Sequence, residues 1–312
     1  MIKSMFSGVS GLRSHQSKMD VIGNNIANVN TYGFKAARAT FKESIYQTMS
    51  GSSNGSKTFG GKNASQVGYG SQIASVDLLF TAGSYAPTDS PTDVMIDGQG
   101  LFMVGKKDTV GQAGHVKNAT DNDKGEIDKL FLSRVGDFKL DGEGYLVDSN
   151  GYVVYGFVNE NTATDPFAPN LEQLKPIRIQ NKTGNYDAEA TERLNVASIS
   201  IDSNGSVLGI DATTNKSVVI GKIAIANVPN ANALEKSQGP YYKALKNVGK
   251  VRAFEAGQGG TGQVMSNGLE MANVDLAREF SDMITTQRGF QANTRIITVS
   301  DQMLEEIMSI KR

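Results

Sequence analysis

The sequence contains no cysteine and no tryptophan, and its 312 residues include only two histidines, His15 and His115. The absence of cysteine excludes disulfides and thiolate metal sites, and two histidines leave little material for a catalytic triad or a zinc site. No apolar run approaches the length that spans a bilayer, and the N-terminus lacks the continuous apolar core of a secretory signal. We therefore expect no catalytic residues, no cofactor, no metal centre and no membrane insertion.

An excess of charge of one sign is also missing. Lysine and arginine number 31 against 32 aspartates and glutamates, which gives a formal net charge of −1. A balanced chain has no basic field that would hold nucleic acid or an anionic membrane, so we expect no nucleic-acid partner. Proline is scarce at 7, whereas glycine is abundant at 34, a composition that suits many short strands joined by tight turns.

Apolar residues recur at alternating steps of three and four at both ends of the chain. This near-heptad spacing is typical of a helix that buries one seam against another helix, as in a coiled coil. We predict one helix over residues 2–29 and a second that is capped by Asn273 or Asp275 and runs through Ile310. The predicted packing residues are Ile2, Met5, Val9, Leu12, Met19 and Ile26, and Leu276, Phe280, Met283, Phe290, Ile297, Leu304 and Met308.

The C-terminal helix carries a second apolar stripe beside the first. One stripe suffices for a two-helix pair, so two stripes indicate burial on several sides, against other copies of the chain. The competing interpretation is a helix that packs only on its own β domain. If neighbours are needed, the terminal helices should stay largely disordered in the free subunit. The second stripe consists of Ala277, Ile284, Ile296, Val299, Met303, Ile307 and Ile310.

The middle of the chain reads as β structure. From residue 72 to about 272 the apolar period switches to two, and Asp-Gly or Asn-Gly pairs at 141–142, 150–151 and 204–205 predict hairpins. Before this region, residues 36–49 have helix-compatible spacing. The fold class is thus mainly β with terminal α-helices. The expected domains are 1–35 with 273–312 as a helical inner domain, 36–71 as an extended arm, and 72–272 as a β-rich outer domain with a small subdomain within 159–230.

Two motifs resemble ligand sites without meeting their requirements. Gly257 to Gly262 has the spacing of a dinucleotide fingerprint, but Ser266-Asn267-Gly268 would interrupt the helix that must follow, so we interpret it as a connector. Residues 121–128 resemble a calcium loop, yet the twelfth position is Leu132 instead of a bidentate carboxylate. The sequence leaves open whether these residues bind a divalent ion weakly.

Two long motifs near the ends resemble the signatures of bacterial flagellar rod and hook proteins. The first runs from Met19 to Lys35, and the second runs from Ser266 to Leu276 and continues into the last helix. Residues 97–102 and 134–141 are similar to the β-domain motifs of the same family. The signature residues are Asn24, Asn25, Ala27, Asn28, Thr31, Gly33, Phe34 and Lys35, and Asn273, Val274, Asp275, Gln287 and Arg288.

The resemblance implies a structural protein of the bacterial flagellum instead of an enzyme. Such a subunit is exported unfolded through the type III apparatus and assembles with copies of itself into a helical tube, with the terminal helices inside and the β domain outside. Its other implied partners are the distal rod, the hook cap and the hook-filament junction proteins. A secreted adhesive β protein would explain the middle of the chain but not the paired terminal stripes. A hydrolase would need a convergent polar pocket, which the sequence does not display.

Within the family, two members remain in view. Residues 29–35 and 287–291 look most like the compact hook proteins of Gram-positive bacteria, which form a curved universal joint that passes torque from motor to filament. Residues 46–48 and the segment 50–71 also resemble the distal rod protein, a straight drive shaft. We favour the hook, with the distal rod as the alternative.

Overall fold

The computed structural model describes residues 2–55, 60–107, 115–119, 126–158, 170–179, 196–212 and 216–310. The chain divides into two compact units. Unit 1 consists of Met1–Val29, Ala36–Leu79 and Val274–Arg312, and unit 2 consists of Asn30–Lys35 and Phe80–Asn273. Unit 1 holds both long helices and unit 2 consists mainly of short strands, which confirms the predicted fold class of a mainly β chain with terminal helices.

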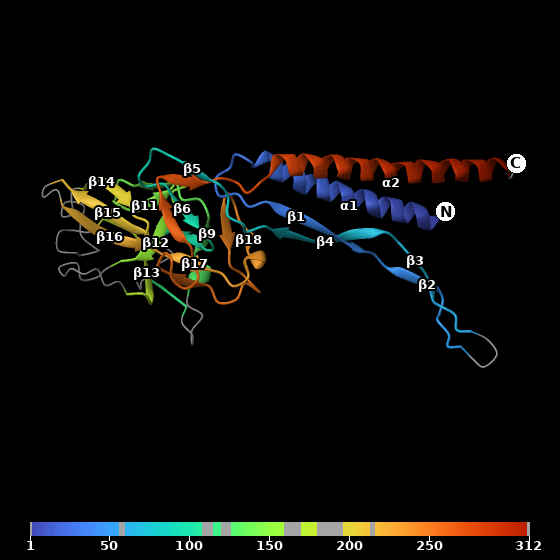
Figure 1. The fold of residues 1–312 in the computed structure, drawn as a ribbon, viewed down its shortest axis with the longest axis horizontal. Helices are drawn as coiled ribbons and strands as arrows, with labels where there is room; N and C mark the ends of the chain where they lie inside the picture. Colours follow the sequence, from blue (N-terminus) through green and yellow to red (C-terminus); the bar gives the residue numbers. More distant parts are fainter. Residues whose placement is uncertain are drawn as a thin grey trace. The chain divides into compact units, whose positions relative to one another are not determined.

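Two long helices form the spine of unit 1. Helix α1 spans Ile2–Ala27 and helix α2 spans Leu276–Ile310. They lie side by side, with the two chain termini at the same end (Figure 1). Asp275 caps α2, because its Oδ1 accepts hydrogen bonds from the backbone amides of Ala277 at 3.0 Å and Arg278 at 3.3 Å. The predicted pairing and the predicted helix limits are confirmed to within two residues.

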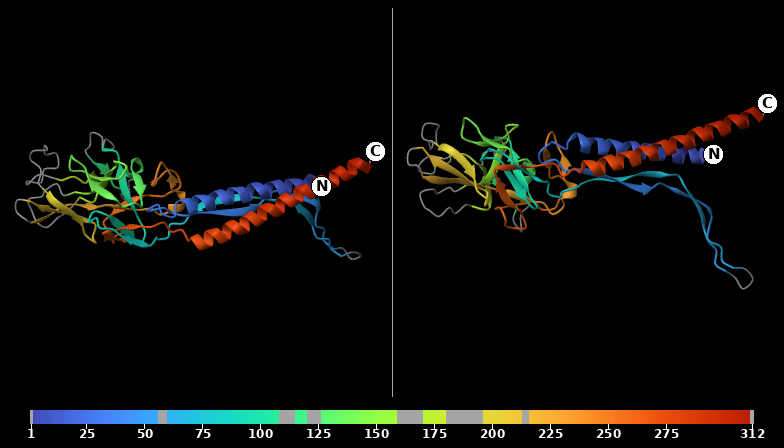
Figure 2. Two further views of the ribbon diagram at one scale, coloured as in Figure 1. Left: turned by 90° about the horizontal axis from the view of Figure 1, so that it is seen from above. Right: turned by 45° about the horizontal axis from the view of Figure 1, so that its top comes forward.

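The residues that follow the first signature form strands, so the helix-compatible spacing of residues 36–49 does not correspond to a helix. Strand β1 (Ala37–Glu43) pairs antiparallel with β4 (Ser71–Leu78), and β2 (Tyr46–Ser50) pairs with β3 (Ser65–Gly68). Threonine, phenylalanine and tyrosine favour strands, but the pairing partners lie far along the chain, where local spacing cannot reveal them. Figure 2 shows the β2–β3 hairpin continuing from the β1–β4 pair. From here on, the arm means this hairpin alone, which is part of the segment 36–71 that was expected to be extended.

Unit 2 is built on one large sheet of 14 strands among the described residues, with the central order β14-β15-β16-β12-β7-β9-β19-β18. Two further antiparallel pairs, β6–β21 and β5–β22, complete it. The strands are β5 Tyr85–Pro87, β6 Val94–Asp97, β7 Leu101–Gly105, β8 Val116–Lys117, β9 Phe131–Ser133, β10 Phe138–Leu140, β11 Leu146–Asp148, β12 Val153–Phe157, β13 Gln173–Pro176, β14 Val196–Ile201, β15 Ser206–Asp211, β16 Ser217–Ile223, β17 Ile225–Asn227, β18 Glu235–Lys236, β19 Tyr241–Lys243, β20 Arg252–Phe254, β21 Gln263–Ser266 and β22 Gly268–Glu270, with 3-10 turns at Ile127–Lys129 and Ala231–Ala233.

The predicted hairpins are present. Strands β10 and β11 pair, β11 pairs with β12, and β14 pairs with β15. Gly151 and Gly205 adopt φ angles of 81° and 71°, the left-handed conformation that such turns require. Strands β16 and β17 follow each other directly along the chain, but they pair with other strands instead of each other. Fully buried apolar side chains from these strands, among them Ile96, Phe102, Val104, Phe138, Val154, Phe157, Ile223 and Ile225, form the core of unit 2.

The segment interpreted as a connector, Gly257 to Gly262, is a turn that leads directly into strands β21 and β22. The short strands β8 and β13 lie far apart in the sequence and pair with each other. Most of the calcium-like loop, residues 121–125, and much of 159–195 lie outside the described residues.

Candidate assembly surfaces and the boundary clamp

Small residues lie where α1 and α2 approach each other closely. A Cβ atom added to Gly8 would lie 3.4 Å from Cγ1 of Ile297, and one added to Gly11 would lie 2.8 Å from Nδ2 of Asn293. Glycine therefore lets the two backbones approach more closely than larger residues would. The fully buried positions along the pair are also mostly small or polar: Ser14, Ile22 and Asn25 on α1, and Thr286 and Ser300 on α2.

The large apolar residues of the predicted packing set flank this seam or face away from it. Met5, Leu12, Met19, Ile26, Met283, Phe290, Ile297 and Leu304 are half-buried, whereas Val9, Leu276, Phe280 and Met308 are exposed. The side chain of Ile2 lies outside what the structure describes. The seam of small residues gives no hydrophobic signal, so the sequence pattern did not find it.

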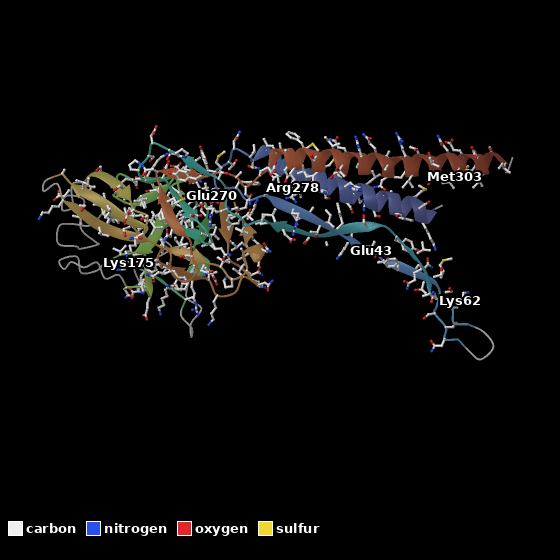
Figure 3. The ribbon with its side chains drawn as sticks, viewed as in Figure 1. Glu43, Lys62, Lys175, Glu270, Arg278 and Met303 are labelled. Atoms are coloured by element: carbon white, nitrogen blue, oxygen red, sulfur yellow. The ribbon has the colours of Figure 1, made fainter. Side chains whose placement is uncertain are left out.

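The second stripe of α2 is exposed along its length. Ile284, Ile296, Val299, Met303, Ile307 and Ile310 are each between 41% and 83% accessible. Figure 3 marks Met303 toward the free end of the helix. Exposed apolar side chains in this number on one helix are typical of a surface that another protein covers.

Substituting Gly289 tests the small-residue seam. A Cβ atom there would lie 2.7 Å from Cε1 of His15, so we expect Gly289→Ala to lower the stability of the helix pair by about 1–3 kcal/mol through overpacking. Gly23→Ala is the matched control, because a Cβ at Gly23 meets no atom within 4 Å and the change should add up to about 1 kcal/mol of helix propensity. Thermal melting of the far-UV helical signal in assembled protein measures both. Equal effects of the two variants would contradict the close contact.

His15 lies between the two helices and the β1–β4 pair. Its ring meets Phe41 edge-to-face at a centroid distance of 5.8 Å, and its Nδ1 is buried with no hydrogen-bond partner among the described residues. Burial and the nearby ammonium group of Lys18 lower the pKa of His15 below 6.5. Lys18 itself lies 3.9 Å from Asp282 of α2. The packing around the seam therefore disfavours the protonated form of His15.

We expect the helix pair to weaken in mild acid. Because the pKa of His15 is lowered in the folded state, the unfolded chain binds the proton first, so this contribution to stability is full above pH about 6.5 and is lost as pH falls through the folded-state value. Helical melting temperatures measured between pH about 7.5 and about 5.5 should fall, and His15→Gln should flatten the slope. An unchanged slope in that variant would assign the pH dependence to other groups.

A buried cluster of three charges, hereafter the boundary clamp, lies in unit 2. Nζ of Lys35 donates to Oε1 of Glu270 at 2.8 Å, and Nε of Arg134 donates to Oε2 of the same carboxylate. All three side chains are at most 4% exposed. Burial alone would raise the pKa of Glu270, but the positive charges of Arg134 and Lys35 hold it below 4.5. The carboxylate is thus the anion that keeps two buried cations in place.

The boundary clamp joins the segments through which the chain enters and leaves unit 2. Lys35 also donates to the carbonyl of Thr81 at 2.7 Å, and the Glu270 carboxylate accepts the amide of Gly83 at 2.8 Å. Nδ2 of Asn273 donates to Oγ1 of Thr81 at 2.9 Å. The segment that ends at Lys35, the segment that begins at Phe80 and the segment that ends at Asn273 are therefore fastened to one another. Sequence reasoning marked Lys35 and Asn273 as signature residues but did not find this cluster.

The other signature residues are placed on both units. Asn25 bonds both polar groups of Ala37, with Nδ2 donating to its carbonyl at 2.8 Å and Oδ1 accepting its amide at 2.9 Å. Gly33 has a φ angle of 67°, and its amide donates to the carbonyl of Glu270 at 2.8 Å. Asn28 donates to Oδ1 of Asn24 at 3.0 Å. Ala27, Thr31, Gln287 and Arg288 are exposed, Phe34 and Val274 are half-buried, and the ring of Phe34 lies 4.4 Å from Nζ of Lys236.

The described part of the chain offers little for chemistry. It contains no cluster of three histidine or acidic side chains that could hold a metal, and none of its helices is long and apolar enough to cross a membrane. The turn at Gly257 to Gly262 leads into strand β21 instead of a helix, so the dinucleotide geometry is absent there. The features that stand out are packing surfaces and a structural ion cluster.

Two models of known protein families match the two ends of the chain, which hold the helices described above. A family model described as flagella basal body rod protein matches residues 5–35, and one described as flagellar basal body rod FlgEFG protein C-terminal matches residues 265–310. These ranges contain most of α1 with the first signature, and α2 with the second.

Relatives align over the full chain. The flagellar basal-body rod protein FlgG of Bacillus subtilis (strain 168) is 38% identical over 313 residues, covering all of both chains. FlgG of Borreliella burgdorferi is 30% identical over 318 residues, and the flagellar hook protein FlgE of the same species is 28% identical over an alignment of 462 residues, each again covering both chains fully. This chain therefore belongs to the flagellar rod and hook family, whose members are structural subunits of the bacterial flagellum.

Proposed function

We propose that this chain is the subunit of the flagellar hook, a curved helical tube that acts as a universal joint between motor and filament. The observation that carries the proposal is the arm. Its strands contain five and four residues, their register shifts between Thr48 and Ser50, and nearly all of its described residues are exposed. An isolated two-stranded hairpin of this length is only marginally stable and therefore compliant, which suits contacts that must slide as a tube bends.

The exposed apolar side chains of the two helices also support the proposal. The exposed stripe of α2 and the exposed side chains of Phe6 and Val9 on α1 would form the inner wall, where large apolar contacts between copies resist torque. Contacts between two different surfaces of one chain generate open helical polymers, as a tube requires. Unit 2 would form the outer layer, and the neighbours at either end would be the distal rod, the hook cap and the hook-filament junction proteins, after export through the type III apparatus.

A second candidate is the distal rod, and one observation favours it. The relative from Bacillus subtilis, which is named a rod protein, aligns over 313 residues, whereas the hook protein of Borreliella burgdorferi needs an alignment of 462 residues. The chain thus has the length of the rod-named relatives and lacks the extra residues of that hook protein. A straight drive shaft would use the same helical wall with stiffer outer contacts.

Electron microscopy of polymers grown from the purified chain separates the two candidates. Curved tubes, or tubes that change curvature with temperature and salt, support the hook. Uniformly straight and stiff tubes support the rod and contradict the hook proposal. Absence of any polymer at concentrations where known axial subunits assemble would contradict both.

Removing the arm tests its mechanical role. Deleting residues 47–66 and joining the ends with two glycines should leave β1 and β4 paired, because their hydrogen bonds lie outside the deletion. We expect tubes that still form but whose persistence length changes at least severalfold, since the contacts that limit sliding are gone. Persistence lengths measured from electron micrographs give the result. Tubes of unchanged persistence length would contradict a mechanical role for the arm.

A further inference from the structure

The end of α2 extends beyond α1. Along the pair, Gly8 lies against Ile297, Gly11 against Asn293 and His15 against Gly289, so the helices run antiparallel in constant register. Continuing this register places Met303 beside the start of α1. The last turns, residues 304–310, therefore project about 10 Å past it. Figure 1 shows the C-terminal end of α2 extending beyond the N-terminal end of α1. We call residues 304–310 the overhang.

The overhang is apolar, acidic and uncovered. Ile307, Met308 and Ile310 are 50%, 75% and 83% exposed. Glu305 and Glu306 directly precede them, and no lysine or arginine occurs from Ile296 to Ile310; Lys311 and Arg312 follow only afterwards in the sequence. Three of the chain's large apolar side chains thus stand in solvent on a helix with no partner from α1.

A groove of about 410 Å³ lies elsewhere in unit 1, between α1 and β4. Its apolar lining includes Phe6 and Val9, which are 62% and 37% exposed, together with Ile73. Arg13 stands at the groove, and α1 carries no acidic residue before Asp20. The walls are held together by hydrogen bonds, because Oγ of Ser14 donates to the carbonyl of Ser71 at 3.0 Å.

We propose that the groove binds the overhang of a second copy of this chain. The two surfaces match in chemistry: apolar side chains meet apolar side chains, and Glu305 and Glu306 approach Arg13. The overhang of the same chain cannot fill the groove, because α2 is one continuous helix fixed alongside α1. The arm of a second copy is the main rival occupant, but Lys62 on its described part repeats the positive charge of Arg13.

The contact joins two different surfaces, and such a contact builds an open filament when the rotation per copy does not close a ring. Each added copy would present a new overhang or a new groove, so the contact propagates as an open filament. This inference rests on the proposed function and makes it more specific, since it names which end of α2 meets which face of α1.

Engineered cysteines test the contact cleanly because the chain has none of its own. Val9→Cys protein and Ile307→Cys protein are mixed, assembled and oxidised. We expect disulfide-linked dimers that contain one chain of each kind, in most assembled subunits. Val9→Cys mixed with Phe280→Cys is the matched control, because Phe280 is equally exposed but lies at the other end of α2. A third mixture pairs Val9→Cys with Met49→Cys, which lies on the arm. If this mixture forms cross-linked dimers and the mixture with Ile307→Cys does not, the groove binds the arm and the proposal is overturned.

A charge exchange adds a second readout. Arg13→Glu alone, and Glu305→Arg with Glu306→Arg alone, should each raise the critical concentration for polymerisation roughly tenfold, and the triple variant should restore it. If unmodified protein forms tubes but the 9–307 cross-link and the rescue are both absent, the docking contact is wrong while the proposed function stands. If unmodified protein forms no tubes, the proposed function fails and the docking contact fails with it.

Discussion

Glu270→Gln is expected to lower the free energy of unfolding of unit 2 by about 3–5 kcal/mol, because it removes the anion of the boundary clamp and leaves two buried cations uncompensated. Both Lys35 and Arg134 are at most 4% exposed, so water cannot replace the lost charge without opening the core. For a unit of this size the melting temperature should fall by roughly 6–20 °C. Denaturant unfolding followed by near-UV circular dichroism of the tyrosines measures the change.

Two further variants sharpen this expectation. Lys35→Met should cost less than Glu270→Gln, because Arg134 remains to balance the carboxylate and the cluster becomes neutral. Glu235→Gln is the matched control on an exposed carboxylate of β18 and should change stability by less than about 0.5 kcal/mol. If Glu270→Gln proves as stable as the control, or if Lys35→Met is the more damaging change, the account of the clamp is wrong.

The second large effect concerns assembly. Phe280→Asp should raise the critical concentration for polymerisation at least about 30-fold, which corresponds to the 2 kcal/mol or more that a central interface residue contributes. Phe280 is 50% exposed in the single chain, so the substitution should leave the folded subunit intact. Sedimentation of polymer at graded protein concentrations measures the change.

The control for Phe280→Asp is Gln291→Asp, which places the same charge on an exposed polar position of the same helix. It should assemble nearly as well as the unmodified chain. Ile297→Asp is a less specific test, because Ile297 also touches Gly8 inside the helix pair. Normal assembly of the Phe280→Asp protein would show that this face of α2 is not an interface.

Local signals in the sequence predicted the helices well. The cap at Asp275 needs only the residues next to it, and the apolar periodicity of both ends survives in the structure as α1 and α2. The tight turns before Gly151 and Gly205 were predictable for the same reason, since one residue decides whether a positive φ angle is available.

Features that depend on distant partners were not predictable. Glu270 meets Arg134 across 136 positions and Lys35 across 235, and no local pattern joins such residues. The seam of Gly8, Gly11 and Gly289 was missed because glycine contributes close approach instead of hydrophobicity. The spacing of residues 36–49 is also compatible with a helix, and only the pairing of β1 with β4 shows that this segment is extended.

A three-dimensional reconstruction of the polymer by electron cryomicroscopy would show which surfaces of the subunit meet. We expect a tube in which α1 and α2 line the inner wall, with the exposed stripe of α2 covered by neighbouring copies and unit 2 on the outside. A polymer whose inner wall is made by unit 2, or in which the stripe from Ile284 to Ile310 still faces solvent, would contradict it.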